Sequence, residues 1–380
     1  MVEWKTIDDI SNSVFAGGTP STKHKNYYDG DIPWIRSGEI DFNTITKAER
    51  NITQEGYNNS SAKLIRKGSV VMAMTGATVA KSAIVEYETS ANQSVCAIET
   101  DESIANYKYV YFYLAKEYFK IKSSAQGALT SLNLAMIKQI EIPIPSLEEQ
   151  TRIVGILDTF TATIDNLKEQ IAQRRKQYEY YRDQLLDLEG KEGVEMKALG
   201  EICDIFDGTH QTPHYTESGI RFVSVENIKN LRASTKYISA QDYEVNYRVK
   251  PQRNDVLMTR IGDVGSCAII NFDEPIAYYV SLSLLRPNHD CVISNYMKYL
   301  LESQTGRREI RKRTLLTAVP LKINLGDIGK LVLPVPSLSD QRRIVSILDT
   351  FESSIQNLES QLKEREKQYE YYRNKLLTFE

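Results

Sequence analysis

The sequence contains one 48-residue segment twice. Residues 142–189 align without a gap on residues 333–380, and 28 of the 48 positions are identical. The shared text runs from PxPSL through QxRIVxILDTF and QYEYYR to a final pair of leucines. The blocks that precede the two copies are much less alike. A repeat of this kind indicates that one structural unit was duplicated, so the chain should fold as two related halves.

Apolar residues within each copy recur at alternate steps of four and three, which predicts a coiled-coil helix. The first copy carries Ile153, Leu157, Phe160, Ile164, Leu167, Ile171, Tyr178, Tyr181, Leu185 and Leu188, and the second carries the matching set from Ile344 to Phe379. One seam position in each copy is instead an arginine, Arg174 and Arg365. These arginines either fix the register of the helix pair or lay their stems along the seam with the charge in water.

Each predicted helix has a start signal, a serine directly after the PxP segment followed three positions later by an acidic residue. The pairs are Ser146 with Glu149 and Ser337 with Asp340. Gly190 and Gly193 supply a stop signal for the first helix. Some 44 residues at 1.5 Å each would make a rod of roughly 65 Å. Because a short connector leads from the first helix into the second domain, and the second helix follows that domain, antiparallel pairing of the two helices is the economical arrangement.

The predicted organisation is four segments: a domain at 1–145, a helix at 146–189, a domain at 190–336 and a helix at 337–380. The domains are faintly repeated as well, since IPWIRSGEI at 32–40 matches IRFVSVENI at 220–228, and GSVVMAMTG at 68–76 matches NDVLMTRIG at 254–262. Both pairs are typical of short strands in mixed α/β domains. The predicted fold is therefore a duplicated mixed α/β chain, with two domains joined by an antiparallel coiled coil and related by pseudo-twofold symmetry.

Composition limits the classes of function. The formal net charge of −3 is the wrong sign for a protein that simply coats a polyanion, so any face for DNA must be local. No apolar run reaches the ~18 residues of a membrane span, and the N-terminus lacks the pattern of a secretory signal, so we expect a cytoplasmic protein. The four cysteines are scattered, which predicts neither a disulfide framework nor a metal site.

Motifs of enzymes are missing from the sequence. TGATVAKS at 75–82 is one residue short of a phosphate-binding loop and lacks the glycine before its lysine, so we interpret it as a turn between strands. His210 and His214 flank Pro213, which excludes a helical zinc face. No glycine-rich cofactor fingerprint, methyltransferase motif or nuclease carboxylate cluster is present. We expect a chain without a catalytic centre, cofactor or metal, and we interpret the aromatic segment 107–119 as a buried helix rather than a base-stacking platform.

Loops that mix basic, hydroxyl and amide groups are the candidates for contact with DNA, because these groups suit phosphates and base edges. They are GGTPSTKHK at 17–25, DGTHQTP at 207–213 and the basic run RREIRKR at 307–313, which could equally be a solvated helix face. Among the arginines, Arg260 at a predicted strand end is the first candidate for reading a base. The predicted contact residues are Thr19, Lys23, Lys25, Arg36, Lys81, Thr209, His210, Arg221, Arg253, Arg260, Arg307, Arg308, Arg311, Lys312 and Arg313.

Several polar positions off the seam recur in both copies of the helix, and seam packing does not account for them. Two equivalent outer surfaces would suit two copies of one partner. The predicted partner-binding residues are Gln150, Lys176, Gln177, Tyr180 and Arg182 in the first copy and Gln341, Lys367, Gln368, Tyr371 and Arg373 in the second.

The whole chain resembles the specificity subunit of type I restriction-modification enzymes. The resemblance rests on IPIPSLEEQTRI at 142–153, LPVPSLSDQRRI at 333–344, DGTHQTP at 207–213 and the duplicated helix; the first domain departs from it, with GGTP at 17–20. It implies two target recognition domains, each reading one half of a split double-stranded DNA site. It also implies a helical spacer that binds two modification subunits, which methylate adenine. Restriction subunits would add ATP-driven translocation and cleavage to the complex. The alternatives are a coiled-coil adaptor that binds only proteins and an enzyme with an unrecognised active site.

Overall fold

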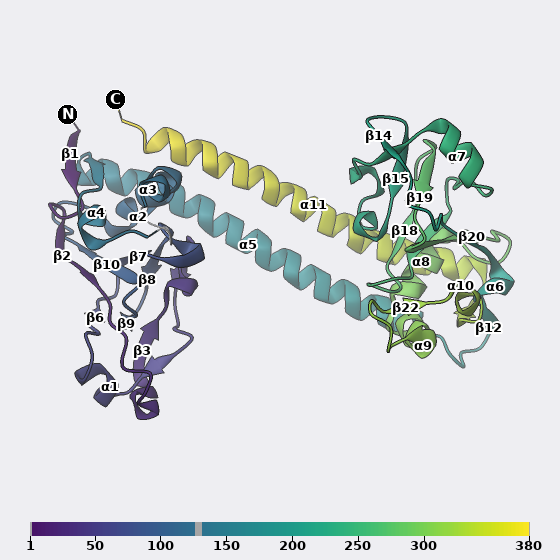
Figure 1. Cartoon of the computed structure of the whole chain (residues 1–380), viewed down its shortest axis with the longest axis horizontal. Coiled ribbons are helices and arrows are strands. Elements are labelled where there is room, and N and C mark those ends of the chain that lie inside the picture. The colour runs from purple at the N-terminus through teal and green to yellow at the C-terminus, as the bar shows by residue number, and fades with distance from the viewer. Residues whose placement is uncertain (1, 126–130, 380) are drawn as a thin grey trace. The chain divides into compact units, whose positions relative to one another are not determined.

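The protein is described here by a computed structural model that covers residues 2–125 and 131–379. The chain divides into two compact units, Met1–Leu167 with Gln361–Glu380, and Lys168–Ser360. Each unit contains one mixed α/β domain, the N-terminal part of the long helix that follows that domain, and the C-terminal part of the other long helix (Figure 1). The boundary between the units therefore crosses both long helices, because each part of a helix packs on the domain beside it.

The first unit builds its domain from two mixed sheets and a two-stranded ribbon. The strand orders are β2-β10-β7-β8-β4, β5-β3-β9-β6 and β1-β11. The strands are β1 Glu3–Thr6, β2 Ser11–Ala16, β3 Tyr28–Ile35, β4 Thr44–Ile45, β5 Asn51–Ile52, β6 Leu64–Ile65, β7 Val70–Ala73, β8 Ser82–Val85, β9 Thr89–Ala91, β10 Val95–Thr100 and β11 Glu141–Ile144. The helices are α1 Gln54–Asn58, α2 Tyr107–Lys116, α3 Tyr118–Ser124, α4 Leu134–Lys138 and α5 Leu147–Leu186.

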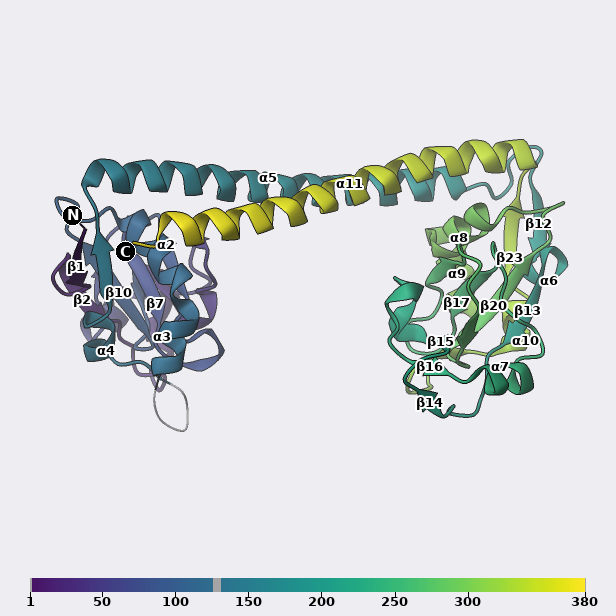
Figure 2. The same ribbon diagram turned by 90° about the horizontal axis from the view of Figure 1, so that it is seen from above.

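The central strand β7 feeds two cores because successive side chains of a strand point to opposite faces. Val70 and Met72 face the core that contains α2 and the start of α5, whereas Val71 and Ala73 face the second sheet. Burial on both faces explains why the strand is continuously apolar. Figure 2 shows α2 beside the β10–β7 sheet.

The second unit repeats this plan. Its sheets are β13-β20-β17-β18, β14-β16-β15-β19, β12-β23 and β21-β22. The strands are β12 Glu195–Ala198, β13 Cys203–Asp207, β14 Tyr215–Thr216, β15 Ile220–Val223, β16 Tyr237–Ile238, β17 Val256–Thr259, β18 Cys267–Ile269, β19 Ile276–Tyr278, β20 Leu282–Pro287, β21 Thr314–Leu315, β22 Lys322–Ile323 and β23 Val332–Val335. The helices are α6 Leu199–Ile202, α7 Ala240–Asn246, α8 Ser294–Glu302, α9 Gln304–Arg313, α10 Leu325–Ile328 and α11 Leu338–Leu376.

The strand registers match the two domains residue by residue. β3 pairs with β9 in parallel, with Trp34 opposite Ser90, and β15 pairs with β19 in parallel, with Phe222 opposite Ala277. Likewise Val95 lies opposite Ala73, and Leu282 lies opposite Thr259. The faint repeats at 32–40 and 220–228, and at 68–76 and 254–262, are confirmed as equivalent strands of mixed α/β domains.

Two local interpretations of the sequence are confirmed. The aromatic segment 107–119 contains the whole of α2, whose residues from Tyr109 to Ala115 are all buried, although Phe119, which lies beyond it in α3, is 80% exposed. TGATVAKS is the turn between β7 and β8, where Ala80 has a φ of 66°.

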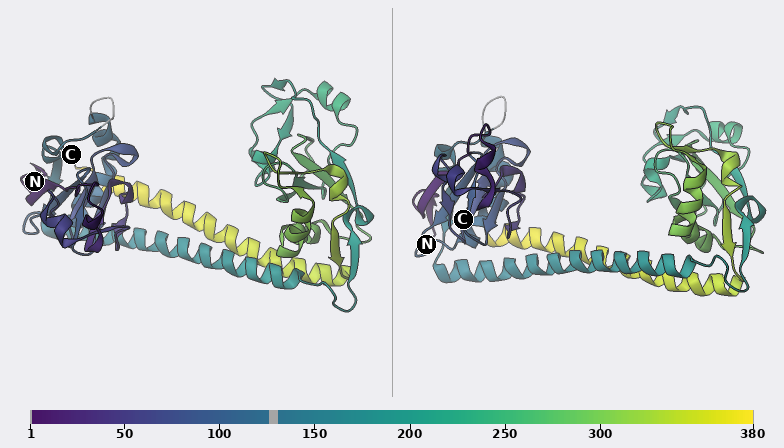
Figure 3. Two further views of the ribbon diagram at one scale, coloured as in Figure 1. Left: turned by 60° about the horizontal axis from the view of Figure 1, so that its bottom comes forward. Right: turned by 90° about the horizontal axis from the view of Figure 1, so that it is seen from below.

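The two long helices contact each other within each unit through equivalent aromatic pairs. In the first unit the ring of Phe160 stacks on Tyr372 at 5.3 Å, and in the second Phe351 stacks on Tyr181 at 5.4 Å. In each pair, a residue from the first half of one helix contacts a residue from the second half of the other helix. The pairing is therefore antiparallel, as predicted. Figure 3 shows the two helices side by side within each unit.

The seam arginines lie over these phenylalanine rings. The guanidinium carbon of Arg365 is 5.8 Å from the ring centroid of Phe160, and that of Arg174 is 5.9 Å from the ring of Phe351. Each arginine thus makes a cation–π contact with the partner helix. This contact favours a specific role in pairing over simple solvation of the charge.

The predicted serine start signals cap the helices. Ser146 Oγ accepts a hydrogen bond from Glu149 N at 3.3 Å, and Ser337 Oγ accepts one from Asp340 N at 3.2 Å. The Glu149 carboxylate does not return to the cap, because it pairs with Arg152 at 2.6 Å.

Candidate nucleic-acid interface and partner surface

A charged cluster lies at the strand ends of the second domain. Asp207 ends β13, and Arg260 follows β17 directly. Arg260 Nη1 donates to Asp207 Oδ1 at 2.9 Å, and His210 Nε2 lies 2.8 Å from Asp207 Oδ2. The Arg260 side chain is only 12% exposed, whereas the His210 side chain is 69% exposed. Asp207 therefore binds both side chains, and His210 is the more exposed of the two.

Backbone contacts fix the loop that carries His210. A Cβ on Gly208 would lie 2.5 Å from the carbonyl of Tyr279, so only glycine allows this close approach. Thr209 N donates to Tyr278 O at 3.3 Å, and Val280 N donates to Thr209 O at 3.0 Å. The tyrosine hydroxyl of Tyr278 donates to Asp207 O at 2.9 Å. The DGTH segment is thus held against the end of β19.

The other predicted arginines before β18 have partners within the domain. Arg221 donates to Ser234 O and lies 5.3 Å over the ring of Tyr237. Arg253 forms a two-pronged pair with Asp273, at 2.8 and 3.0 Å, on the surface. This pair uses Nε and Nη2, so the remaining N–H groups of Arg253 stay available for a phosphate oxygen.

The basic run at 307–313 is helical and lies on α9. Its cations are largely balanced: Arg308 pairs with Glu189 at 2.7 Å, and Lys312 and Arg313 both pair with Glu309. Arg307 Nε donates to Glu302 O at 3.1 Å. In the described part of the chain, Arg311 has no ion-pair partner. The balanced charges favour the solvated-face interpretation for most of the run.

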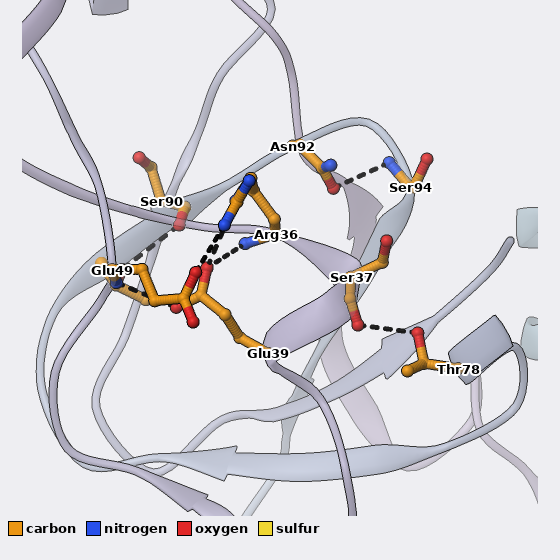
Figure 4. A network of polar contacts seen from close by, with 9 residues as sticks. Arg36, Ser37, Glu39, Glu49, Thr78, Ser90, Asn92 and Ser94 are labelled. Carbon is orange, nitrogen blue, oxygen red and sulfur yellow. Dashed lines mark hydrogen bonds and ion pairs between the residues drawn. The ribbon is translucent and has the colours of Figure 1, made fainter. Parts of the chain in front are cut away.

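In the first domain the strand-end network centres on Arg36, which follows β3 (Figure 4). Arg36 N donates to Glu39 Oε1 at 2.8 Å, and its guanidinium pairs with Glu49. Glu49 N donates to the other oxygen of Glu39 at 3.0 Å. Thr78, in the β7–β8 turn, donates to Ser37 O at 2.8 Å. This network joins the end of β3 to the β7–β8 turn.

Four predicted residues of the first domain remain. Lys81 lies in the β7–β8 turn, and Thr19, Lys23 and Lys25 lie between β2 and β3. Lys81 pairs with Asp41 and lies 5.7 Å from the ring of Phe42, and Thr19 donates to Gln93. Lys23 and Lys25 are exposed. Within residues 2–125 and 131–379 neither of these two lysines has an ion-pair partner.

Equivalent strand ends carry different chemistry in the two domains. By the strand registers, Asp207 and Arg260 correspond to Ala16 and Met74, which form no ion pair. Arg36 corresponds to Ser224, whose N donates to Asn227 Oδ1 at 3.1 Å, as Arg36 N donates to Glu39. The two domains share their strand pairing, but the arginine follows β3 in the first domain and β17 in the second. The sequence analysis missed Asp207 and Glu39, although Asp207 begins the DGTHQTP loop and Glu39 lies within the faint repeat at 32–40.

The predicted partner surface divides into exposed and buried members. Lys176, Gln177, Lys367, Tyr180 and Tyr371 are exposed; the two tyrosines are 58% and 59% exposed. The other three are half-buried: Arg182 pairs with Asp183, Arg373 lies over Tyr369, and Gln368 accepts a hydrogen bond from Arg365.

The prediction that Gln150 and Gln341 bind a partner is wrong, because both side chains are fully buried. Gln150 accepts a hydrogen bond from Asn106 N at 2.8 Å and donates to Ile104 O at 3.1 Å and Pro145 O at 2.9 Å. Gln341 makes the equivalent three bonds in the second domain. These glutamines tie each domain to the start of its own helix, so neither side chain can contact a partner.

Residues with metal-binding side chains do not gather in the described chain: no group of three or more histidine, cysteine, aspartate or glutamate residues could hold an ion there. None of the helices in that same part combines the length and apolar character that crossing a bilayer requires.

The fold and these surfaces define a class of protein: a duplicated chain in which the strand-end surfaces of the two mixed α/β domains differ, and each domain is fixed to the start of a long pairing helix. Two stretches of the chain, residues 1–174 and 191–366, match the family model of the type I restriction modification DNA specificity domain. The chain belongs to this family.

Individual relatives are also described as type I specificity subunits. The specificity subunit of the EcoR124I/EcoR124II type I restriction enzyme of Escherichia coli is 33% identical over 51% of this chain and 50% of its own length. A candidate type I specificity subunit of Haemophilus influenzae is 28% identical over 100% of this chain and 96% of its own. The chain thus spans about half the length of the first relative and nearly all of the second.

Solved structures show the same fold. The type I S subunit of M. genitalium superimposes with a TM-score of 0.63 at 16% identity, over 100% of this chain and 97% of its own. A chain from a study of complex assembly in a type I restriction-modification system gives 0.64 at 19% identity, over 99% and 97%.

Proposed function

We propose that this chain is the non-catalytic DNA-recognition subunit of a type I restriction-modification complex and acts in the cytoplasm. Each domain reads one half of a bipartite double-stranded target. The outer surfaces of the long helices bind two modification subunits, and restriction subunits join through that complex.

The observation that carries the proposal is that the two domains share their strand pairing but have different charged groups at their strand ends. A duplicated framework whose strand ends hold Asp207 and Arg260 in one domain, and Arg36 in the other, would read two unrelated half-sites. Both arginines also have a buried Nε without a hydrogen-bond partner among the described residues, which is a costly condition in a folded protein. The names of the relatives, which are specificity subunits of restriction enzymes, support the same proposal.

The test exchanges one domain. Residues 1–145 are replaced by the equivalent block of a relative, the chimera is expressed with its modification partner, and the methylated motif is read by sequencing the methylated bases of the host genome. The expected result is a motif in which one half-site changes and the other persists. A well-assembled chimera that recognises both halves anew would overturn independent reading.

Gel-shift binding separates this proposal from a coiled-coil adaptor that binds only proteins. With the modification partner present, a DNA reader retains its own motif selectively over other duplexes, whereas an adaptor shows no selectivity.

A point substitution locates the reading group. Arg260→Ala should relax one position of the second half-site at a cost of about 1–3 kcal/mol, as expected for a lost base contact. Arg311→Ala is the matched comparison, because loss of a phosphate contact weakens all sequences alike. An Arg260→Ala variant with unchanged affinity and motif would contradict this assignment.

A further inference from the structure

The hairpin β21–β22 presents apolar side chains to solvent. Val319 is 99% exposed, Leu316 55%, Leu321 41% and Leu315 40%. Thr314 lies opposite Ile323 and Leu315 opposite Lys322, so the hairpin is a two-stranded antiparallel ribbon with an apolar tip. Four large apolar side chains exposed in one short segment are unusual for a soluble surface and mark an interaction site.

Backbone hydrogen bonds join this ribbon to the strand end that carries Arg260. Ile323 N donates to Arg260 O at 3.0 Å, and Gly262 N donates to Leu321 O at 2.8 Å. Ile261 and Lys322 form an antiparallel bridge. The apolar tip is therefore continuous with the candidate DNA-reading cluster, and movement of one would displace the other.

One exposed cation precedes the ribbon in sequence and another lies within it. Arg311 precedes it on α9, and Lys322 lies in β22; both are exposed. In the part of the chain that the structure describes, neither has an ion-pair partner. Unpaired cations beside an apolar tip suit a surface that meets phosphates at its edges and bases at its centre.

Resting on the proposed function, we propose that β21–β22 is a major-groove ribbon whose apolar tip contacts thymine methyl groups of the second half-site. The major groove of B-DNA admits a two-stranded β-ribbon, and the thymine 5-methyl is the only apolar group that base pairs display there. Val319 and Leu316 at the tip are the contact residues, and Arg260 at the base of the ribbon reads a neighbouring polar edge. This assigns a specificity role to a segment without any recognised motif.

The test removes one methyl group at a time. The chain is assembled with its modification subunits and bound to a duplex that carries its methylated motif, with each thymine of the second half-site replaced in turn by uracil. Wild-type complex should bind at least one uracil duplex about fourfold more weakly, the effect of burying one methyl group. The double variant Val319→Ser with Leu316→Ser should bind that uracil duplex and the thymine duplex equally.

The controls use the same chemistry elsewhere. Val245→Ser changes an equally apolar residue of α7, 74% exposed, and should leave the preference for thymine intact. Uracil in the first half-site should not distinguish the hairpin variant from the wild type. Equal binding of thymine and uracil duplexes by the wild type, or a preference that persists in the hairpin variant, overturns the inference while leaving the proposed function standing. Absence of any sequence-selective binding overturns both.

Discussion

Replacing Gln150 with leucine should destabilise the first unit, because this glutamine connects three backbone groups of the domain. Leucine fills a similar volume but can neither donate nor accept a hydrogen bond. The substitution would leave Asn106 N–H and the carbonyls of Ile104 and Pro145 without their partners.

The magnitude follows from these three bonds. A hydrogen bond contributes roughly 0.5–1.5 kcal/mol net, and a buried group left unpaired costs roughly 1–3 kcal/mol. Loss of all three bonds should therefore lower the free energy of unfolding by about 3 kcal/mol or more. With a urea dependence of about 2–3 kcal/mol per molar, the unfolding midpoint should fall by roughly 1–1.5 M.

Tryptophan fluorescence provides the assay, because both tryptophans of the chain, Trp4 and Trp34, lie in the first unit and Trp34 is buried. Gln139→Leu is the matched control, since Gln139 is exposed in the same unit and its replacement should change stability by less than about 0.5 kcal/mol. If Gln150→Leu unfolds at the wild-type urea concentration yet binds the modification subunit more weakly, the glutamine is a partner contact and the reasoning from burial is wrong.

Three further outcomes are expected. Burial raises the pKa of Glu302 above that of the unfolded chain, so between the two pKa values the native state binds more protons and its stability should fall as pH rises. In Glu302→Gln this fall in stability should be smaller, as measured by urea titrations from acidic to mildly alkaline pH. An unchanged dependence of stability on pH would contradict this expectation. Arg174→Met removes the guanidinium over Phe351 but keeps an apolar stem, and should cost about 0.5–1 kcal/mol in urea unfolding; no loss would show that the ring contact adds nothing. Tyr180→Ala and Tyr371→Ala should each weaken one of two modification-subunit sites, giving complexes with a single modification subunit in native mass spectrometry, whereas full two-subunit binding by both variants would exclude these tyrosines.

The sequence determined the features that depend on short-range periodicity and on comparison of the chain with itself. Hydrophobic steps of four and three define a helix face whatever surrounds it, so the long helices could be predicted, and the order of the segments with their short connector predicted the antiparallel pairing. The duplicated text placed the domains before each helix, and the faint repeats around β3 and β15 located equivalent strands. Serine caps likewise follow from residues three positions apart.

Tertiary structure alone decided which polar side chains are available. Gln150 belongs to the repeated pattern just as Tyr180 does, yet its bonds to Asn106 N and Ile104 O reach across 44 and 46 residues and bury it. Arg260 meets Asp207 across 53 residues, and no spacing rule brings β13 and β17 together through β20. The apolar tip at Val319 was also overlooked, because exposure of a hydrophobic residue depends on what packs on it. Local patterns fix local geometry, whereas burial and charge pairing are set by strand order, which joins residues that are far apart in the chain.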